Sequence, residues 1–294
     1  MTRCLELPIF FRCVNRCLFC SSDMRAAGAH VLSLKEIDVV LRKMKRRGFT
    51  HVTFTGGEPT LHPQFIGALQ AAKALGYRTQ VVTNGSALAI ARLRKRALPL
   101  LDELCVSIHG HNAKLHDGLT QNPKSFSRIR KTLAGVRGPA LIVNTVVNRL
   151  NVSSLPAIAE FVCGQRGVKQ FWVSGLIPEG EGLRNYEQLA VPYKEILKNV
   201  PRLAATAARR GVAIRFFAIP LCTLGEYRAF NSALYKNPSA AVSRSGKVLA
   251  NGLPMPKAVK TARCKGCVLR TSCPGIWEPY KRLFGDSELK AVKA

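Results

Sequence analysis

The sequence predicts an α/β fold, in which parallel strands alternate with helices, followed by a small cysteine-rich domain. Short apolar runs recur at intervals of roughly thirty residues between segments of helical periodicity. Strands that alternate with helices in this way form parallel sheets with right-handed crossovers. Polar loops follow the strands, and the alternation fades near residue 219, where Gly, Pro and Cys become frequent. A change of domain is therefore expected there.

The elements can be placed in order along the chain. The apolar segment 5–11 is the first expected strand, and a capping box of Ser33 and Glu36 begins a helix that Gly48 ends. Further strands are expected at 51–55, 78–83, 103–109, 140–147, 169–174 and 213–219. Further helices are expected at 64–75, 88–98, 126–136, 155–165 and 192–210. Six β-α units cannot close an eight-stranded barrel. We therefore expect a partial (β/α)6 TIM-like barrel over residues 1–218 and a small Cys-rich C-terminal domain over residues 219–294.

Length and composition indicate a soluble protein with one large core. The chain has 294 residues, of which 47% are hydrophobic, and ten of them are cysteines. No apolar run is long enough to span a bilayer, and a polar cysteine-rich stretch interrupts the N-terminal segment where a signal peptide would continue. We expect a cytoplasmic protein without a membrane partner, in which the cysteines bind metal rather than form disulfides.

The formal net charge of +28 is extreme. Basic runs occupy residues 42–47, 92–96 and 128–131, all within expected helices. Such runs are ordinarily solvated outer faces, but they also attract RNA, acidic peptides or an acidic electron-donor protein. Because no aromatic residues are interleaved with them, base stacking is not indicated. Nucleic acid is a partner to consider, but not the favoured one.

Three cysteines near the N-terminus share one short loop: Cys13, Cys17 and Cys20, spaced C-x3-C-x2-C. Three thiolates can hold three corners of a [4Fe–4S] cubane and leave the fourth iron without a protein ligand. An open coordination position implies that a reactive molecule binds there. Zinc is the alternative, although a zinc site would need a fourth ligand close by, and none follows before His30.

This cysteine triplet, with aromatic Phe19 before its last thiol, resembles the signature of the radical S-adenosylmethionine (SAM) superfamily. The Gly-Gly-Glu-Pro segment at 56–59, which ends the next strand, is similar to that family's companion motif. The resemblance covers about residues 5–180. It implies that SAM binds the open iron and is cleaved reductively to a 5′-deoxyadenosyl radical, which abstracts hydrogen from a substrate. It also implies a reduced flavodoxin- or ferredoxin-type electron donor.

The resemblance carries over to individual SAM-binding residues. Gly56 and Gly57 would let the backbone contact the SAM amino group, assisted by Glu58, with Pro59 completing the motif. Phe19 would lie against the adenine. Asn84 and Ser107, at the next two strand ends, are candidates for the ribose or carboxylate, although Asn84 and Gly85 could simply form a turn. Segments 144–148 and 178–182, with Asn151, resemble later strand-end segments that contact adenine, ribose or substrate; plain loop roles are the alternative.

A second cysteine group lies in the C-terminal region and consists of Cys222, Cys264, Cys267 and Cys273. Four thiolates make a closed site, either a second [4Fe–4S] cluster or structural zinc. Many radical SAM enzymes carry a C-terminal extension of the SPASM or shorter twitch type that binds auxiliary clusters, so the resemblance favours the cluster. Such a cluster could accept an electron from a substrate radical.

The remaining histidines and cysteines suggest no catalytic residue. His109, His111 and His116 are expected at the mouth of the barrel, where any one could titrate near neutrality and serve as an acid or base. A polar loop role is the simpler interpretation of each. Cys105 and Cys163 are expected to be buried, and Cys4 could be an exposed thiol.

The favoured function is a radical SAM oxidoreductase or maturase that acts on a peptide or protein, or else on a small metabolite. A radical SAM enzyme that modifies RNA is one alternative, which the charge encourages. A zinc-bearing, non-catalytic nucleic-acid-binding protein is another, but it leaves residues 56–59 without a purpose.

Overall fold

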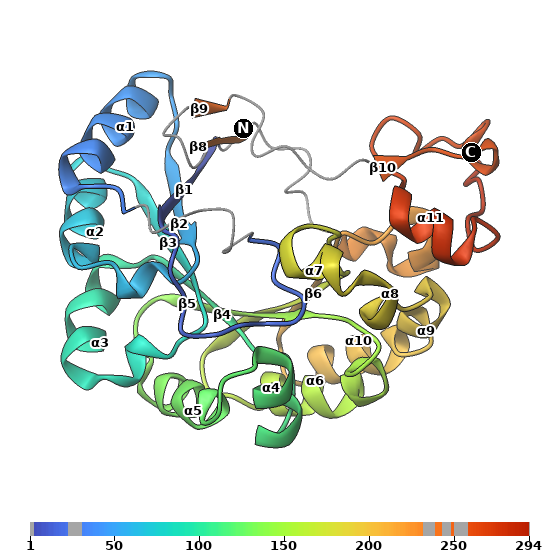
Figure 1. The fold of residues 1–294 in the computed structure, drawn as a ribbon, viewed down its shortest axis with the longest axis horizontal. Coiled ribbons are helices and arrows are strands. Elements are labelled where there is room, and N and C mark those ends of the chain that lie inside the picture. The colour runs from blue at the N-terminus through green and yellow to red at the C-terminus, as the bar shows by residue number, and fades with distance from the viewer. Residues whose placement is uncertain (1–2, 23–30, 232–238, 243–247, 250–257, 294) are drawn as a thin grey trace.

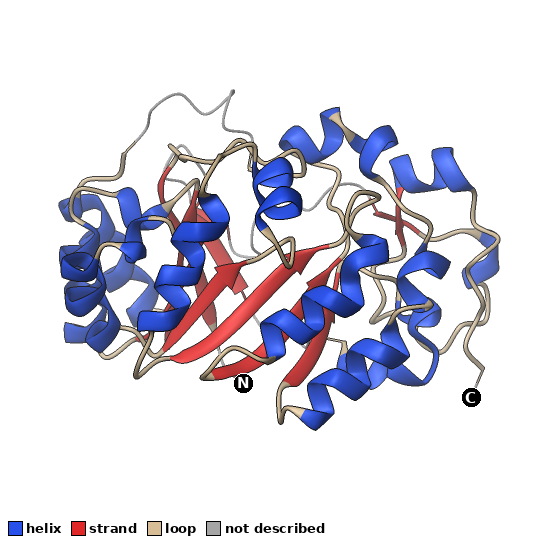
Figure 2. Ribbon diagram, turned by 90° about the horizontal axis from the view of Figure 1, so that it is seen from below, coloured by secondary structure: helices blue, strands red, loops and turns tan. Residues whose placement is uncertain are grey.

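A computed structural model describes residues 3–22, 31–231, 239–242, 248–249 and 258–293. Its main feature is a curved sheet with helices packed on the outer face (Figures 1 and 2). The strands lie in the spatial order β7-β6-β5-β4-β3-β2-β1-β8-β9. All neighbouring pairs from β7 to β8 are parallel, and only the β8–β9 pair is antiparallel. Because this order is linear, the described sheet is an open barrel, as the sequence predicts.

The bounds of the strands follow the expected apolar runs closely. They are β1 Cys4–Phe10, β2 His51–Gly56, β3 Arg78–Thr83, β4 Glu103–Ser107, β5 Ala140–Val146, β6 Val168–Ser174, β7 Ala213–Phe217, β8 Ser239–Val242 and β9 Val248–Leu249. Two further short strands, β10 Ala258–Val259 and β11 Ile276–Trp277, pair antiparallel in the C-terminal region. β8 was not expected: it comes from the C-terminal region, yet it pairs with β1 and extends the barrel sheet.

The helices form the outer layer and the C-terminal end of the molecule (Figure 1). They are α1 Leu34–Arg46, α2 Phe65–Ala74, α3 Ala91–Ala97, α4 Ala113–Thr120, α5 Ser125–Gly135, α6 Leu155–Cys163, α7 Gly180–Arg184, α8 Tyr186–Leu189, α9 Tyr193–Leu197, α10 Val200–Arg209 and α11 Glu278–Phe284. The Ser33–Glu36 capping box is present at the start of α1. The single helix expected over 192–210 is instead two helices, because Pro201 lies in the first turn of α10 and lacks the N–H that a continuous helix would need. No helix in the described part of the chain is long and apolar enough to cross a membrane.

The two faces of the sheet differ in polarity. On β2, Val52 and Phe54 are fully buried under the helices, while Thr53 between them is half-buried on the inner face. Inner-face polar groups bond across neighbouring strands: Thr53 Oγ1 donates to Gln80 Oε1 at 2.9 Å, and Gln80 Nε2 donates to Glu103 Oε2 at 2.8 Å. The hydrophobic core therefore lies between sheet and helices, and the inside of the barrel is polar.

The C-terminal segment packs beside α9. The rings of Tyr193 and Tyr280 stack with centroids 4.1 Å apart, and the Tyr280 hydroxyl accepts a hydrogen bond of 3.0 Å from the backbone N–H of Tyr193. Figure 1 shows α11 and β10 at this end of the molecule, beyond α8 and α9. Two parts of the C-terminal region therefore lie in different places. β8 joins the barrel sheet beside β1, whereas α11, with β10 and β11, lies at the end of the molecule next to α9.

Candidate functional site

The cysteine loop, residues 11–22, follows β1 and is held from two sides. The backbone N–H groups of Arg16 and Leu18 donate to the carbonyls of Thr120 and Leu119 at the end of α4, at 2.9 and 3.1 Å. On the other side, the N–H of Glu58 donates to the Arg12 carbonyl at 2.9 Å. The loop therefore lies at the carboxyl ends of the strands, where parallel α/β sheets bind their ligands.

A second set of contacts covers the last cysteine of the loop. The N–H of Gly182 donates to the Cys20 carbonyl at 3.1 Å, and a Cβ on Gly180 would lie only 2.8 Å from the same oxygen. The Asn185 side chain donates to the Leu18 carbonyl at 2.9 Å. The segment 178–182 thus packs on the cysteine loop, a role that its two glycines make possible and that the sequence did not reveal.

Cys13, Cys17 and Cys20 are half-buried. Burial raises the pKa of Cys13 to about 11 and that of Cys17 well above its usual range, and charges on Cys20 and Cys13 raise the Cys17 pKa further. Such thiols stay protonated near neutrality unless a cation binds, because ligation to metal offsets the cost of the buried negative charge. The donor set therefore fits an iron–sulfur cluster.

The three thiols are not arranged as a site for a single metal ion. Within the described ranges, no three His, Cys, Asp or Glu side chains are grouped so as to hold one metal ion. A cubane does not require that convergence, because each thiolate binds a different iron.

Gly56 and Gly57 bring the ends of β1 and β2 together. Gly56 has φ +130°, and a Cβ there would lie 2.3 Å from the Phe10 carbonyl oxygen. The N–H of Gly57 donates to that same oxygen at 2.6 Å. Only glycine fits this close approach at position 56. The contact of these residues with the SAM amino group remains a prediction.

Glu58 is a fully buried carboxylate at the centre of a hydrogen-bond network. Its Oε1 accepts from the N–H of Thr60 at 3.1 Å, from the Thr60 hydroxyl and from the Thr83 hydroxyl at 2.6 Å. Its Oε2 accepts from the N–H of Asn84 at 2.7 Å. Burial raises the Glu58 pKa, and these four donors oppose the rise. The carboxylate thus ties the end of β2 to the end of β3, while Pro59 begins a buried 3-10 turn, Pro59–Leu61.

Comparison with known proteins decides the family. The model of the "Radical SAM superfamily" matches residues 7–162, which is more than half of the chain. The chain belongs to the radical SAM superfamily. Membership implies a [4Fe–4S] cluster and SAM as cofactors.

Solved radical SAM structures share the fold. Streptococcus suis SuiB bound to S-adenosylmethionine is 17% identical with a TM-score of 0.67, over 99% of this chain and 76% of SuiB. Native anSMEcpe with bound AdoMet and the Cp18Cys peptide is 14% identical with a TM-score of 0.68, over 99% of this chain and 93% of that one. In SuiB bound to its precursor peptide SuiA, this chain matches only 58% of the SuiB length, with 17% identity and a TM-score of 0.60. At these identities the likeness shows the fold alone.

The other expected SAM contacts of this radical SAM protein lie on neighbouring strand ends. The Phe19 ring is buried edge-on against His109, with centroids 4.3 Å apart. Asn84 follows β3, and Ser107 ends β4 directly opposite Asn144 of β5. The Asn144 Oδ1 in turn accepts from the Ser174 hydroxyl at 2.6 Å. The fold therefore brings these residues to one edge of the sheet, but their contacts with SAM remain predictions.

Two of the three histidines are structural. His109 and His116 are buried, with rings stacked 5.9 Å apart, and the His116 Nδ1 accepts from the backbone N–H of His109 at 3.1 Å. Burial lowers the pKa of His116 to about 4 and that of His109 well below its usual range. Neither of these two can titrate near neutrality, which corrects the expectation from the sequence. His111 bonds instead to its neighbour, with Nε2 2.9 Å from the Asn112 Nδ2.

The cysteines outside the two groups lie mostly as expected. Cys105 and Cys163 are buried, as predicted. Cys4 is half-buried on β1, with its Sγ 3.5 Å from the Thr53 hydroxyl, and is not an exposed thiol.

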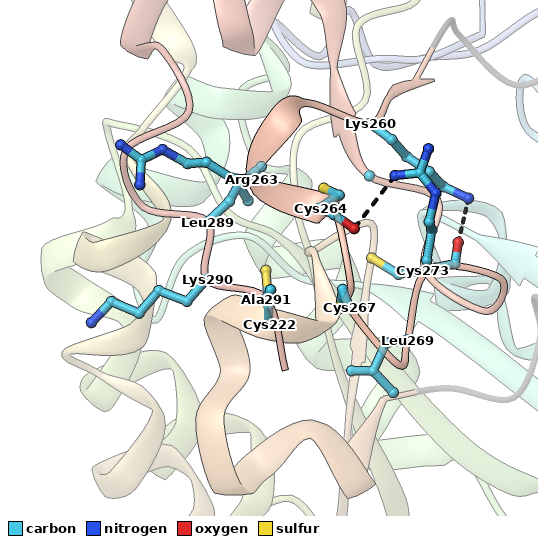
Figure 3. Close-up of a pocket in the computed structure, with 12 residues that line it drawn as sticks. Cys222, Lys260, Arg263, Cys264, Cys267, Leu269, Cys273, Leu289, Lys290 and Ala291 are labelled. Carbon is cyan, nitrogen blue, oxygen red and sulfur yellow. Dashed lines mark hydrogen bonds between the residues drawn. The ribbon is translucent and has the colours of Figure 1, made fainter. Parts of the chain in front are cut away.

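The second cysteine group gathers around one pocket. Cys222, Cys264, Cys267 and Cys273 line it together, as Figure 3 shows, with Lys260, Arg263, Arg270 and Lys290 among the other lining residues. Burial raises the Cys222 pKa, and charges on the other three thiols raise it further. The N–H of Val292 donates to the Cys267 Sγ at 3.3 Å. Four cysteine side chains around one pocket fit a metal centre, because ligation to metal offsets the cost of gathering their negative charges.

Proposed function

We propose that Cys13, Cys17 and Cys20 hold a [4Fe–4S] cluster whose fourth iron binds SAM. The observation that carries this proposal is the set of three half-buried thiols on a loop fixed between the end of β2 and the end of α4, in a chain of the radical SAM superfamily. A cluster held there would supply the electron for reductive cleavage of SAM, and thereby a 5′-deoxyadenosyl radical that could take hydrogen from a substrate. Gly56, Gly57, Glu58, Pro59, Phe19, Asn84 and Ser107 form the edge at which SAM would lie.

The protein's own contribution is placement and exclusion of water. Phe19 and His109 close the buried side of the cysteine loop, and residues 180–185 cover it from outside. A site that is closed in this way keeps a reactive radical from solvent. Polar side chains at the carboxyl ends of β5 and β6, Asn144 and Ser174, offer hydrogen bonds to a polar substrate.

We further propose a second [4Fe–4S] cluster at Cys222, Cys264, Cys267 and Cys273, within a twitch- or SPASM-like region over residues 219–294. Four thiols around one pocket suit a cubane, whose irons each take one thiolate; zinc, for which the thiols would have to converge on one point, is the alternative occupant. The domain boundary after residue 218 is also a proposal. β8, at residues 239–242, lies beyond that boundary in the chain but belongs to the barrel sheet. The role of this second cluster would be to accept an electron from the substrate radical, so that the net reaction would be an oxidation.

The substrate that we propose is a peptide or protein, with a small metabolite as the alternative. Two proteins of the same fold were solved with peptides, SuiB with its precursor SuiA and anSMEcpe with Cp18Cys. A reduced flavodoxin- or ferredoxin-type protein in the cytoplasm would supply electrons, and the basic faces of α1, α3 and α5 would attract such an acidic partner. Co-purification with a peptide supports the first choice, whereas co-purification with RNA contradicts it.

Anaerobic reconstitution with iron and sulfide tests the proposed function. The wild-type protein should bind about eight irons per chain, corresponding to two cubanes, and should form 5′-deoxyadenosine when reduced in the presence of SAM. Cys17→Ala should lose deoxyadenosine formation. Cys163→Ala, which removes a buried thiol on α6 far along the chain from either group, should keep it. Retention of zinc with no cleavage of SAM by the wild-type protein would overturn the proposal.

A further inference from the structure

Asn84 makes a contact that its expected role as a SAM ligand does not explain. Its side-chain Nδ2 donates to the Sγ of Cys13 at 3.4 Å. The same sulfur accepts a second hydrogen bond, also of 3.4 Å, from the backbone N–H of Asn15. Cys13 thus has two N–H donors, one from its own loop and one from the end of β3, seventy-one residues along the chain.

The orientation of the Asn84 amide is fixed by its other end. Its Oδ1 accepts a hydrogen bond of 2.8 Å from the backbone N–H of Ser86. A flipped amide would place an NH₂ group against that N–H and an oxygen lone pair against a thiolate. Both contacts would be repulsive, so Nδ2 faces the sulfur.

The backbone of Asn84 is held as firmly as its side chain. Its N–H donates to the Oε2 of fully buried Glu58 at 2.7 Å. Thr83 donates to the other oxygen of Glu58 and accepts from the N–H of Gly85 at 3.0 Å. The four hydrogen bonds that the Glu58 carboxylate accepts therefore come from Thr60, Thr83 and Asn84. The carboxylate of this motif holds the strand end that carries Asn84.

We propose that Asn84 is a positioning residue that donates an N–H···S hydrogen bond to Cys13 and thereby raises the reduction potential of the cluster that this thiolate holds. The inference rests on the proposed function, because it takes Cys13 to be a cluster ligand. Hydrogen bonds to ligand sulfurs stabilise the more negative, reduced state and are one of the means by which proteins set the potential of an iron–sulfur cluster. Glu58 contributes by holding the backbone of Asn84 in place.

The test is the midpoint potential of the reconstituted holoenzyme, followed by electron paramagnetic resonance without SAM. Asn84→Leu removes the donor without adding charge, and Asn84→Asp removes it while keeping an oxygen for Ser86. Asn84→Leu should make reduction less favourable by about tenfold, which is about 59 mV more negative for one electron, and Asn84→Asp by more, because its carboxylate also repels the added electron. If one of these variants fails to assemble a cluster, the other still measures the effect on the potential.

A matched control lies at the same edge of the sheet. Asn112→Leu removes an asparagine whose Oδ1 accepts from the Leu115 N–H at 3.0 Å and that bonds to no cysteine in the described structure, and it should leave the potential unchanged. The signal of the Cys222 site should also stay fixed. An unchanged potential in the Asn84 variants, with or without weaker SAM binding, would overturn the inference. If the wild-type protein forms no cluster at all, the proposed function itself fails, so the two failures are distinct.

Discussion

The Nδ2 of Asn122 donates a 2.6 Å hydrogen bond to the Oδ1 of Asn15, across 107 positions of the chain. Asn15 is buried within the cysteine loop, and Asn122 lies in the turn between α4 and α5. Burial raises the Cys17 pKa, and the Asn15 side chain opposes that rise. The turn after α4 therefore orients an amide that stabilises the thiolate of Cys17, which we propose as a cluster ligand.

Removal of this bond should loosen the cluster. Asn122→Ala leaves the Asn15 oxygen buried without its donor, a loss of about 1–3 kcal/mol. We expect faster release of iron from the reconstituted protein to a chelator. The control is Asn112→Ala, which removes the side-chain cap of α4, a hydrogen bond of 3.0 Å to the Leu115 N–H. It should cost about 1 kcal/mol of stability without faster iron release. Equal release rates in the two variants would contradict this assignment.

Loss of the auxiliary cluster should leave SAM cleavage at the Cys13, Cys17 and Cys20 site intact. Cys267→Ala removes one of four thiols around the pocket and should lower the iron content from about eight to about four per chain. Deoxyadenosine formation should persist, while turnover of the natural substrate stops. Ser272→Ala, a neighbouring change that removes only a hydroxyl bonded to the Leu269 carbonyl, should keep all the iron. Normal turnover by Cys267→Ala would show that the site does not accept electrons.

Two glycines should respond in opposite ways to alanine. Gly56→Ala places a Cβ 2.3 Å from the Phe10 carbonyl oxygen at φ +130°, and backbone strain with a steric clash should cost at least about 3 kcal/mol. Gly118→Ala meets no atom within 4 Å inside α4 and should stabilise the protein by about 0.5–1 kcal/mol. Urea denaturation followed by circular dichroism measures both. A Gly56→Ala variant as stable as wild type would mean that β1 and β2 do not approach so closely.

His116 should make stability depend on pH. Burial lowers its pKa to about 4 from an ordinary value of about 6.5, so the unfolded chain binds the proton more readily between these values. Its contribution is intact above about pH 6.5, declines as the pH falls, and is lost below about 4. The full effect is about 3 kcal/mol.

The variant His116→Gln isolates this effect from the titration of carboxylates. The difference between the wild-type and variant free energies of unfolding should shrink as the pH falls from 6.5 to 4. A difference that is constant across this range would contradict a buried, neutral His116.

Several parts of the fold could be predicted because local sequence determines them. The alternation of Val52 and Phe54 with polar residues marks β2, and Ser33 with Glu36 marks the start of α1. α4 was not expected, although Asn112 caps it, because its eight residues carry too short an apolar pattern. β8 was not expected because four residues give little pattern, and its place depends on pairing with β1.

The candidate site, too, could be predicted from the sequence only in part. The spacing of Cys13, Cys17 and Cys20 predicts a shared cluster because ligand identity and spacing are written in the chain. The burial of Glu58 could not be predicted, because its donors Thr83 and Asn84 come from the next strand end. The role of Gly180 and Gly182 depends on how closely the cysteine loop approaches them in space, which no local pattern encodes.

The most direct test of the account is whether SAM binds the cluster held by Cys13, Cys17 and Cys20. The measurement is electron–nuclear double resonance on the reduced holoenzyme with SAM labelled with ¹⁵N at its amino group. The account predicts a ¹⁵N coupling to the cluster that is absent in Cys17→Ala. A wild-type cluster that forms fully and shows no coupling to labelled SAM would contradict it.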